Sequence, residues 1–432
     1  MSSNNPERFD RTSLTLNKER CYLIGADVPG RYERSEDPLS ELASLVDTAG
    51  GEVIGKLTQK LDHPHRRYFL NKGKFYDLVD LVKESGADTI VVDDNLSATQ
   101  LVSLEEASRA KVIDRSEVIL DIFTSRARSR EAQLQVELAQ LQYKLPRLER
   151  MWTHLERLGG GIGTRGPGES QIESDRRELR RKISVLTADI DDIKHRKERE
   201  VATREEEFTT CLVGYTNAGK SSLLNKLTDA GTYVENQLFA TLDTLTRKLK
   251  LPSGNTILIS DTVGFIRRLP HHLVASFHAT LEEAAQSNLL LYVIDAADPM
   301  SYVHARTVEE TLSSLGMGDK ERLYVLNKTD LIADPAYARR VKEYFTPSIA
   351  VSAVTGEGMD ELIRYIDEKS LLRKRTVRLR IAAGDGKRLA LLNQVGLVQE
   401  TEYDGGDALV KVTLEVADFE RIKKLPGKCE VI

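Results

Sequence analysis

The chain of 432 residues is 40% hydrophobic and 30% charged, and its formal net charge is −5. This length is too great for one hydrophobic core, so about three domains are expected, and the composition excludes a mainly disordered chain. The small net charge does not indicate a nucleic-acid-binding protein as a whole, so any basic surface is expected to be local.

The distribution of residues indicates neither a protein stabilised by disulfides or zinc nor a secreted or membrane-spanning protein. The cysteines at positions 21, 211 and 429 are far apart and match neither a disulfide framework nor a zinc site. The polar N-terminus lacks the apolar stretch of a signal peptide, and no apolar run approaches the roughly 20 residues of a membrane span. We therefore predict a cytoplasmic protein with no integral membrane segment.

Residues 1–120 predict an N-terminal α/β domain. Short apolar runs at 21–25, 53–56, 89–92 and 112–113 fit strands, and they alternate with helix-period stretches at 39–47, 75–83 and 101–108. Ser97 occupies an expected helix N-cap. This alternation is typical of a small parallel sheet flanked by helices. The basic segment 71–74 indicates a solvated turn, with phosphate contact as the less favoured alternative.

Residues 121–205 predict two long helices. Leucines recur at steps of three and four from Leu134 to Leu158, and apolar residues do so again from Leu179 to Ile193. The segment between them, 159–170, is too rich in glycine and proline to be helical, so we expect an antiparallel helical hairpin with this loop at its tip. Pro146 is expected to kink or interrupt the first helix.

Positive charge accumulates on this hairpin. Residues 123–182 contain thirteen Lys and Arg against eight Asp and Glu, a net +5 in a chain that is negative overall. A glycine-rich backbone can approach phosphates and bases closely, so we predict that the tip and its base contact RNA. A solvated charged face is the alternative for the helix arginines. The predicted RNA-binding residues are Gly161, Gly163, Arg165, Gly166, Arg176 and Arg177.

Residues 206–368 predict a nucleotide-binding G domain. The segment 214–221 fits the P-loop pattern GxxxxGKS between an expected strand and an expected helix. In such a loop the backbone N–H groups surround the β-phosphate, Lys220 binds the β- and γ-phosphates, and Ser221 offers its hydroxyl to Mg²⁺. Ser222 follows at the helix start, where N–H groups favour the α-phosphate.

Two later motifs complete the site, and the second identifies the nucleotide as GTP. Asp261 and Gly264 form a DxxG element after an apolar strand, where the carboxylate holds a Mg²⁺-bound water and the glycine N–H faces the γ-phosphate. Asn327, Lys328 and Asp330 form an NKxD element, whose aspartate accepts hydrogen bonds from guanine N1–H and N2–H₂. Adenine lacks both donors, and a site built in this way rejects such an analogue by about 10⁴-fold.

The loop before DxxG is expected to contain the threonine that senses the γ-phosphate. We assign this role, and the second Mg²⁺ ligand, to Thr241, with Thr244 and Thr246 as alternatives. Position 265, where Ras-type GTPases have a water-orienting glutamine, is a phenylalanine without a hydrogen-bonding group. Slow intrinsic hydrolysis is therefore expected, and nothing in the sequence selects His271, His272 or His278 as a substitute.

These motifs together define the predicted site. The predicted catalytic residues are Lys220, Thr241 and Gly264, and the predicted Mg²⁺ ligands are Ser221 and Thr241. GTP and GDP are the expected substrate and product. The predicted nucleotide-binding residues are Gly214, Tyr215, Thr216, Asn217, Ala218, Gly219, Lys220, Ser221, Ser222, Phe239, Ala240, Thr241, Leu242, Asp243, Asp261, Thr262, Val263, Gly264, Asn327, Lys328, Thr329, Asp330, Ser352 and Ala353.

Residues 369–432 predict a small C-terminal α+β domain. The stretches 376–382 and 408–417 alternate like strands, and 387–395 and 418–424 have helical periodicity. No chemistry is visible in this segment, so we expect a packing or partner-binding domain. The predicted fold class is therefore α/β, with a G domain joined to an N-terminal α/β domain, a hairpin arm and this module.

The chain resembles the HflX family in the Obg–HflX branch of GTPases. The most specific match is the sequence GGGIGTRGPGESQIESDRR at 159–177, which is similar to the family's GxGxRGPGExxxExDRR signature. The segment FATLD at 239–243 and the hydrophobic residue after DxxG are also similar to that branch. The resemblance places the family's Mg²⁺ ligands on Ser221 and Thr241.

This resemblance implies a translational GTPase that binds the large ribosomal subunit and its rRNA. The implied role is the splitting or rescue of stalled and dormant ribosomes under stress, with ribosome-stimulated hydrolysis. Apart from the resemblance, we expect no DNA partner and take a monomer as the default. Two alternatives remain open. One is an assembly or RNA scaffold protein in which hydrolysis is incidental, and the other is a second nucleotide site in the N-terminal domain that drives RNA remodelling with ATP.

Overall fold

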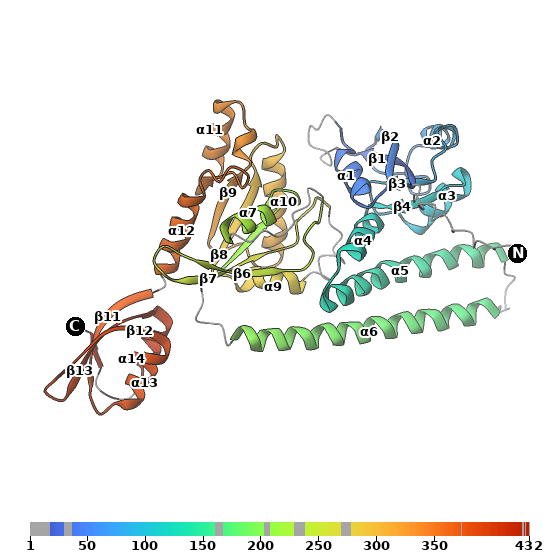
Figure 1. Ribbon diagram of the computed structural model, residues 1–432. Helices are drawn as coiled ribbons and strands as arrows, with labels where there is room; N and C mark the ends of the chain where they lie inside the picture. The colour runs from blue at the N-terminus through green and yellow to red at the C-terminus, as the bar shows by residue number, and fades with distance from the viewer. Residues whose placement is uncertain are drawn as a thin grey trace, which may run out of the picture. The chain divides into compact units, whose positions relative to one another are not determined.

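The computed structural model describes residues 18–29, 37–159, 167–202, 208–228, 238–268, 278–372, 374–425, 427 and 429–431. The chain divides into two compact units, one formed by Met1–Ile122 with Pro146–Gly166 and the other by Phe123–Leu145 with Pro167–Ile432. Its strands form three separate sheets (Figure 1). None of the helices in the described ranges combines the length and the apolar character needed to cross a membrane.

The N-terminal sheet has four parallel strands in the order β2-β1-β3-β4, which confirms the expected alternation of strands and helices. Ser97 caps the helix that follows β3 by accepting a hydrogen bond from the Gln100 N–H in a capping box. The strands are β1 (Arg20–Asp27), β2 (Glu52–Lys60), β3 (Thr89–Val92) and β4 (Lys111–Asp114), and the helices between them are α1 (Ser40–Thr48), α2 (Lys72–Ser85) and α3 (Ala98–Ser108).

One local expectation for this domain is wrong, and one helix was missed. The basic segment at 71–74 is not a turn, because Asn71 is the N-cap of α2 and the lysines lie in its first turn, just before the buried Phe75. Helix α4 (Arg115–Arg126) was not expected. It begins directly after β4 with a buried arginine that is paired with Asp93 and Glu41, and a buried charge conceals the helical hydrophobic pattern.

The hairpin arm consists of α5 (Arg130–Gly159) and α6 (Pro167–Ala202). Leu134 and Leu138, near the start of α5, pack against Leu186 in the second half of α6, which confirms the antiparallel arrangement. Pro146 does not interrupt α5, which continues through it to Gly159. The tip residues Gly161, Gly163, Arg165 and Gly166, and the seam side chains after 147 on α5, lie outside what the structure describes.

The G domain has a six-stranded sheet in the order β10-β9-β8-β5-β7-β6, parallel except for β6. Apolar residues of α7 and α12 pack on one face of the central strands and form its core. The strands are β5 (Thr209–Gly214), β6 (Leu245–Lys250), β7 (Thr256–Asp261), β8 (Leu289–Asp295), β9 (Arg322–Asn327) and β10 (Ser348–Ala350), and the helices are α7 (Lys220–Thr228), α9 (His278–Gln286), α10 (Ser301–Ser314), α11 (Pro335–Tyr344) and α12 (Met359–Leu372).

The C-terminal domain is an antiparallel four-stranded sheet in the order β12-β13-β11-β14, with two helices packed against it (Figure 1). Its elements are β11 (Lys374–Ala382), α13 (Gly386–Val395), β12 (Gly396–Asp404), β13 (Asp407–Glu415), α14 (Val416–Lys423) and β14 (Cys429–Val431). The α+β class is confirmed. Strand β12 was missed because most of its side chains are exposed, so it lacks the alternation of a half-buried strand.

Candidate nucleotide-binding site

The P-loop connects the end of β5 at Gly214 to the start of α7 at Lys220. Two of its glycines are required by close contacts. A Cβ atom on Gly214 would lie 2.3 Å from the carbonyl oxygen of Val293, and one on Gly219 would lie 2.3 Å from Nδ2 of Asn327. Gly219 also has a φ of 93°, which favours glycine. The loop therefore follows a path that only glycine permits at these two positions.

We expect Gly219→Ala to abolish nucleotide binding, since the added methyl group collides with Asn327 in a strained backbone conformation. Calorimetric titration with GDP checks this. Gly254→Ala is the matched control, because Gly254 has a similar φ of 86° but nothing within 4 Å of the added Cβ. Equal GDP binding by the two variants would contradict the requirement for glycine at 219.

Lys220 lies at the centre of the loop with its side chain buried. Its Nζ donates hydrogen bonds to the carbonyl oxygens of Gly214 at 3.2 Å and Tyr215 at 3.0 Å. Burial lowers the pKa of this lysine to about 8. A Cβ atom on Gly264 would lie 3.1 Å from the same Nζ, so the backbone of the DxxG glycine and the lysine face one space. A polyanion bound in that space would stabilise the protonated, positively charged form of Lys220.

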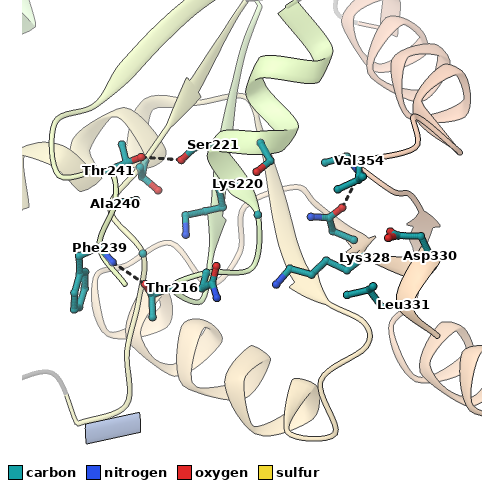
Figure 2. Close-up of a pocket in the computed structure, with 17 residues that line it drawn as sticks. Thr216, Lys220, Ser221, Phe239, Ala240, Thr241, Lys328, Asp330, Leu331 and Val354 are labelled. Atoms are coloured by element: carbon teal, nitrogen blue, oxygen red, sulfur yellow. Dashed lines mark hydrogen bonds between the residues drawn. The ribbon is translucent and has the colours of Figure 1, made fainter. Parts of the chain in front are cut away.

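Three oxygen-bearing side chains, those of Ser221, Thr241 and Asp261, meet beside this lysine, and Figure 2 shows the first two. The Ser221 hydroxyl lies 2.7 Å from the Thr241 hydroxyl and donates to Oδ2 of Asp261 at 2.5 Å. The other carboxylate oxygen of Asp261 is buried without a hydrogen-bond partner, and burial raises the pKa of this aspartate. A buried unpaired carboxylate oxygen next to two hydroxyls is a donor set that suits Mg²⁺.

The two alternatives to Thr241, Thr244 and Thr246, are both described by the structure, and neither lines the cavity. The Thr246 hydroxyl lies 2.8 Å from Ser260 and donates to Glu283, away from the P-loop serine. His271 and His272 lie outside the described residues, as does the side chain of His278. Thr241 is therefore the candidate that the structure places beside Ser221.

Asn327 joins the two ends of the site. Its Nδ2 donates to the carbonyl oxygen of Ala218 in the P-loop at 2.9 Å, and its Oδ1 accepts from the N–H of Ala353 at 3.1 Å. The side chain is buried, so both bonds are protected from water. The NKxD asparagine therefore fixes the phosphate loop and the loop after β10 to each other.

Lys328 and Asp330 lie at the end of the cavity opposite Ser221 and Thr241 (Figure 2). The lysine has a φ of 62° and its Nζ is held 2.6 Å from Oδ2 of Asp295. This ion pair directs the lysine stem along the cavity, where an aliphatic chain can cover the face of a planar base. The arrangement leaves the Asp330 carboxylate as an acceptor at the edge of that base.

The cavity has a volume of about 500 Å³ and brings together most of the predicted nucleotide-binding residues. Leu331 and Val354, which sequence reasoning missed, also line it, and each directly follows a predicted residue. The predicted residues that line it are Thr216, Asn217, Gly219, Lys220, Ser221, Ser222, Phe239, Ala240, Thr241, Thr262, Gly264, Asn327, Lys328, Asp330 and Ala353. Those that do not line it are Gly214, Tyr215, Ala218, Leu242, Asp243, Asp261, Val263, Thr329 and Ser352.

Phe265 takes part in the site only through its backbone. Its N–H donates to the carbonyl oxygen of Gly214 at 3.1 Å, and its carbonyl oxygen accepts from the N–H of Thr216 at 2.7 Å. The ring is buried and does not line the cavity. The residue after DxxG therefore has no polar side-chain group with which to orient a water molecule.

Of the predicted RNA-binding residues of the arm, the structure describes the side chains of Arg176 and Arg177. Arg177 is exposed on α6 and lies 3.3 Å from Glu173, one helical turn earlier, whereas Arg176 is partly buried. Exposed ion pairs of this kind contribute little to stability. Arg177 is therefore available to a partner at small cost.

Three protein-family profiles match the chain in sequence order. The N-terminal domain of GTP-binding GTPases matches residues 36–124, their middle region matches residues 126–204, and a 50S ribosome-binding GTPase domain matches residues 209–328. These segments cover the N-terminal domain from α1 to α4, the helical arm and most of the G domain.

Curated proteins named GTPase HflX match nearly the whole chain. One from Lacrimispora saccharolytica is 44% identical over 390 residues, which cover 89% of this chain and 91% of the relative. One from Escherichia coli K12 is 39% identical, covering 91% of this chain and 93% of the relative. A crystal structure of a GTP-binding protein from Sulfolobus solfataricus in complex with GDP aligns with 81% of this chain and 98% of its own, with 23% identity and a TM-score of 0.43.

Proposed function

Because the chain belongs to the HflX family of GTPases, which hydrolyse GTP, we propose that its hydrolysis cycle acts on the large ribosomal subunit in the cytoplasm. The observation that carries this proposal is the buried Phe265, which gives the position after DxxG no polar group with which to orient the attacking water. A site of this kind hydrolyses slowly alone, and a partner that completes it becomes the trigger. The matched 50S ribosome-binding GTPase domain supports the ribosome as that partner.

In this proposal the P-loop end of the cavity binds the triphosphate. Lys220 neutralises charge on the β- and γ-phosphates, and the Gly264 N–H faces the γ-phosphate. Ser221 and Thr241 would hold Mg²⁺, and Asp261 would act on the ion through a water molecule. When bound, the metal ion draws charge from the phosphate oxygens. Thr241 loses its contact when the γ-phosphate leaves, so its loop reports the nucleotide state.

The opposite end of the cavity recognises guanine. Asp330 accepts hydrogen bonds from N1–H and N2–H₂, and the stem of Lys328 covers the ring. Ala353, whose N–H donates to Oδ1 of Asn327, lies in the loop that we place beside O6 of guanine. Adenine would leave the carboxylate unpaired, which costs more than the loss of one contact.

The arm is the proposed contact with ribosomal RNA. The arm has a glycine-rich tip at 159–170 and positively charged residues, including Arg177, where α6 begins. Both features suit contact with RNA phosphates and unpaired nucleobases. Splitting or rescue of stalled and dormant ribosomes follows if the GTP-bound form wedges this arm into the subunit and hydrolysis releases it.

Co-sedimentation with separated ribosomal subunits tests the proposal. We expect the protein to sediment with large subunits in a non-hydrolysable GTP analogue, to be released in GDP, and to hydrolyse GTP faster when large subunits are present. Small subunits are the control. Equal turnover with and without large subunits would remove the ribosome from the cycle.

Replacement of 159–170 by a short glycine turn is expected to leave GTP affinity within about twofold of wild type and to weaken large-subunit binding at least tenfold. The nucleotide pocket is formed by other segments, so the change should affect large-subunit binding without affecting GTP affinity. Affinity is measured by fluorescence titration and subunit binding by co-sedimentation. Wild-type subunit binding by this variant would contradict the role of the tip.

A further inference from the structure

One predicted nucleotide-binding residue points away from the cavity. Asp243 follows the loop that bears Thr241, and its Oδ2 accepts hydrogen bonds from the backbone N–H groups of Arg128 at 3.1 Å and Ser129 at 3.2 Å. Its Oδ1 accepts from the Ser129 hydroxyl. These groups precede the first turn of α5, the first helix of the arm. Asp243 therefore places a negative charge at the N-terminus of that helix, where it is favoured.

Ser129 continues the connection into the helix. Its Oγ accepts a hydrogen bond from the N–H of Ala132 at 3.1 Å, and its carbonyl oxygen accepts from the N–H of Gln133, which makes it the N-cap of α5. One hydroxyl thus donates to the switch loop and accepts from the arm helix. The cap of α5 is complete only while Asp243 is in place.

A second contact holds the other side of the same loop. The buried ring of Phe239 packs edge-on against Phe123 at the end of α4, with ring centroids 4.7 Å apart and an interplanar angle of 76°. The backbone N–H of Phe239 donates to the Thr216 hydroxyl in the P-loop at 3.0 Å. This residue is therefore anchored to a helix before the arm and to the phosphate loop at once.

Thr241 lies between these two anchors, with its hydroxyl 2.7 Å from Ser221. Phe239 lies in a turn with a φ of 54° and Asp243 lies at a bend, so Thr241 is carried by a short segment that is anchored at both ends. All of these residues belong to the compact unit formed by Phe123–Leu145 with Pro167–Ile432. The segment that carries the γ-phosphate-sensing threonine is therefore anchored on both sides, by Phe239 and by Asp243.

We propose that Asp243 and Phe239 are positioning residues that couple the cap of α5 to the GTP-bound position of Thr241. GTP differs from GDP by the phosphate that Thr241 senses. Contacts of Asp243 and Phe239 that hold Thr241 in position therefore favour binding of GTP over binding of GDP. Coupling is reciprocal, so contacts that strengthen GTP binding are themselves strengthened when GTP binds. The proposal concerns the isolated GTPase and does not depend on the ribosome.

Two matched serine caps provide the first test. Ser129→Ala and Ser97→Ala each remove one serine N-cap, from α5 and α3 respectively, but only Ser129 contacts the switch loop. In the full-length protein we expect Ser129→Ala to weaken binding of a non-hydrolysable GTP analogue about fivefold and GDP less than about twofold. Ser97→Ala is expected to change neither. The same GTP-analogue to GDP affinity ratio in both variants would overturn the proposal.

Asp243 itself gives the second test. Asp243→Ala is expected to weaken the GTP analogue about tenfold with little change for GDP, whereas Asp243→Asn should retain most of the preference, because an amide oxygen still accepts from the same N–H groups. A general loss of folding would lower both affinities together and would not be rescued by asparagine. Equal losses for both nucleotides, or no rescue, would contradict a positioning role.

A double-mutant cycle isolates the coupling. If Asp243 and Ser129 act as one unit, the double variant Asp243→Ala/Ser129→Ala will bind the GTP analogue no more weakly than Asp243→Ala alone. Hydrogen exchange provides an independent readout: the Ala132 amide should exchange more slowly with the GTP analogue than with GDP, and Asp243→Ala should remove this difference. Additive losses of GTP-analogue affinity in the double variant, together with an Ala132 exchange rate that does not depend on the nucleotide, would contradict the proposed coupling.

Discussion

Replacing Lys220 with alanine is expected to weaken GTP and GDP binding about a hundredfold or more and to abolish measurable hydrolysis. Among the described residues that line the P-loop end of the cavity, this buried ammonium is the only cation, and its loss leaves phosphate oxygens desolvated and unpaired. Fluorescence titration with labelled nucleotides and a phosphate-release assay measure the two effects.

The control for this variant lies on the same helix. Lys226 is exposed on α7, so Lys226→Ala makes the same change outside the cavity and should bind nucleotide like the wild type. The Lys220 variant also separates the two functions left open by the sequence. A scaffold in which hydrolysis is incidental would keep its association with ribosomal subunits, whereas a nucleotide-driven cycle would lose its dependence on GTP. Unchanged GTP affinity in Lys220→Ala would contradict the phosphate site itself.

Replacing Asp330 with asparagine is expected to weaken guanine nucleotides about a hundredfold and to favour xanthine nucleotides. The carboxylate offers acceptors to both N1–H and N2–H₂, and an amide keeps one acceptor but turns a donor towards the guanine amino group. Xanthine has a carbonyl at that position, which accepts from the new amide. Competition between GTP and xanthosine triphosphate measures the change of preference.

Asp334→Asn is the matched control for this change. Asp334 caps α11 through an oxygen that accepts from the Ala336 N–H, a contact that asparagine can keep, and it does not line the cavity. It should therefore retain guanine preference. If Asp330→Asn still preferred GTP over xanthosine triphosphate as strongly as the wild type does, base recognition would have to be assigned to another residue.

The G domain could be predicted from the sequence because its chemistry is local. A phosphate loop needs glycine at two tight positions and a lysine at a helix start, and these follow one another within eight residues. Thr241 was also within reach, since it lies between two recognisable motifs. The antiparallel arm followed from a leucine pattern and a loop that cannot be helical.

What the sequence could not provide were contacts between distant segments. Asp243 was expected at the nucleotide because it follows Thr241 directly, yet its partner Ser129 is 114 residues away. The bond from Asn327 to Ala218 spans 109 residues and has no sequence signature of its own. Burial of Arg115 depends on two acidic partners from other elements, which is why α4 escaped recognition.

The bridge made by Asn327 has a kinetic consequence. Because one amide holds the phosphate loop and the loop after β10 together, and Gly219 packs against it without room for a methyl group, neither wall of the cavity can swing open alone. Base and phosphates are then bound by a single rigid body. Nucleotide egress should proceed as one first-order event, with no partly detached state in which the base has left and the phosphates remain.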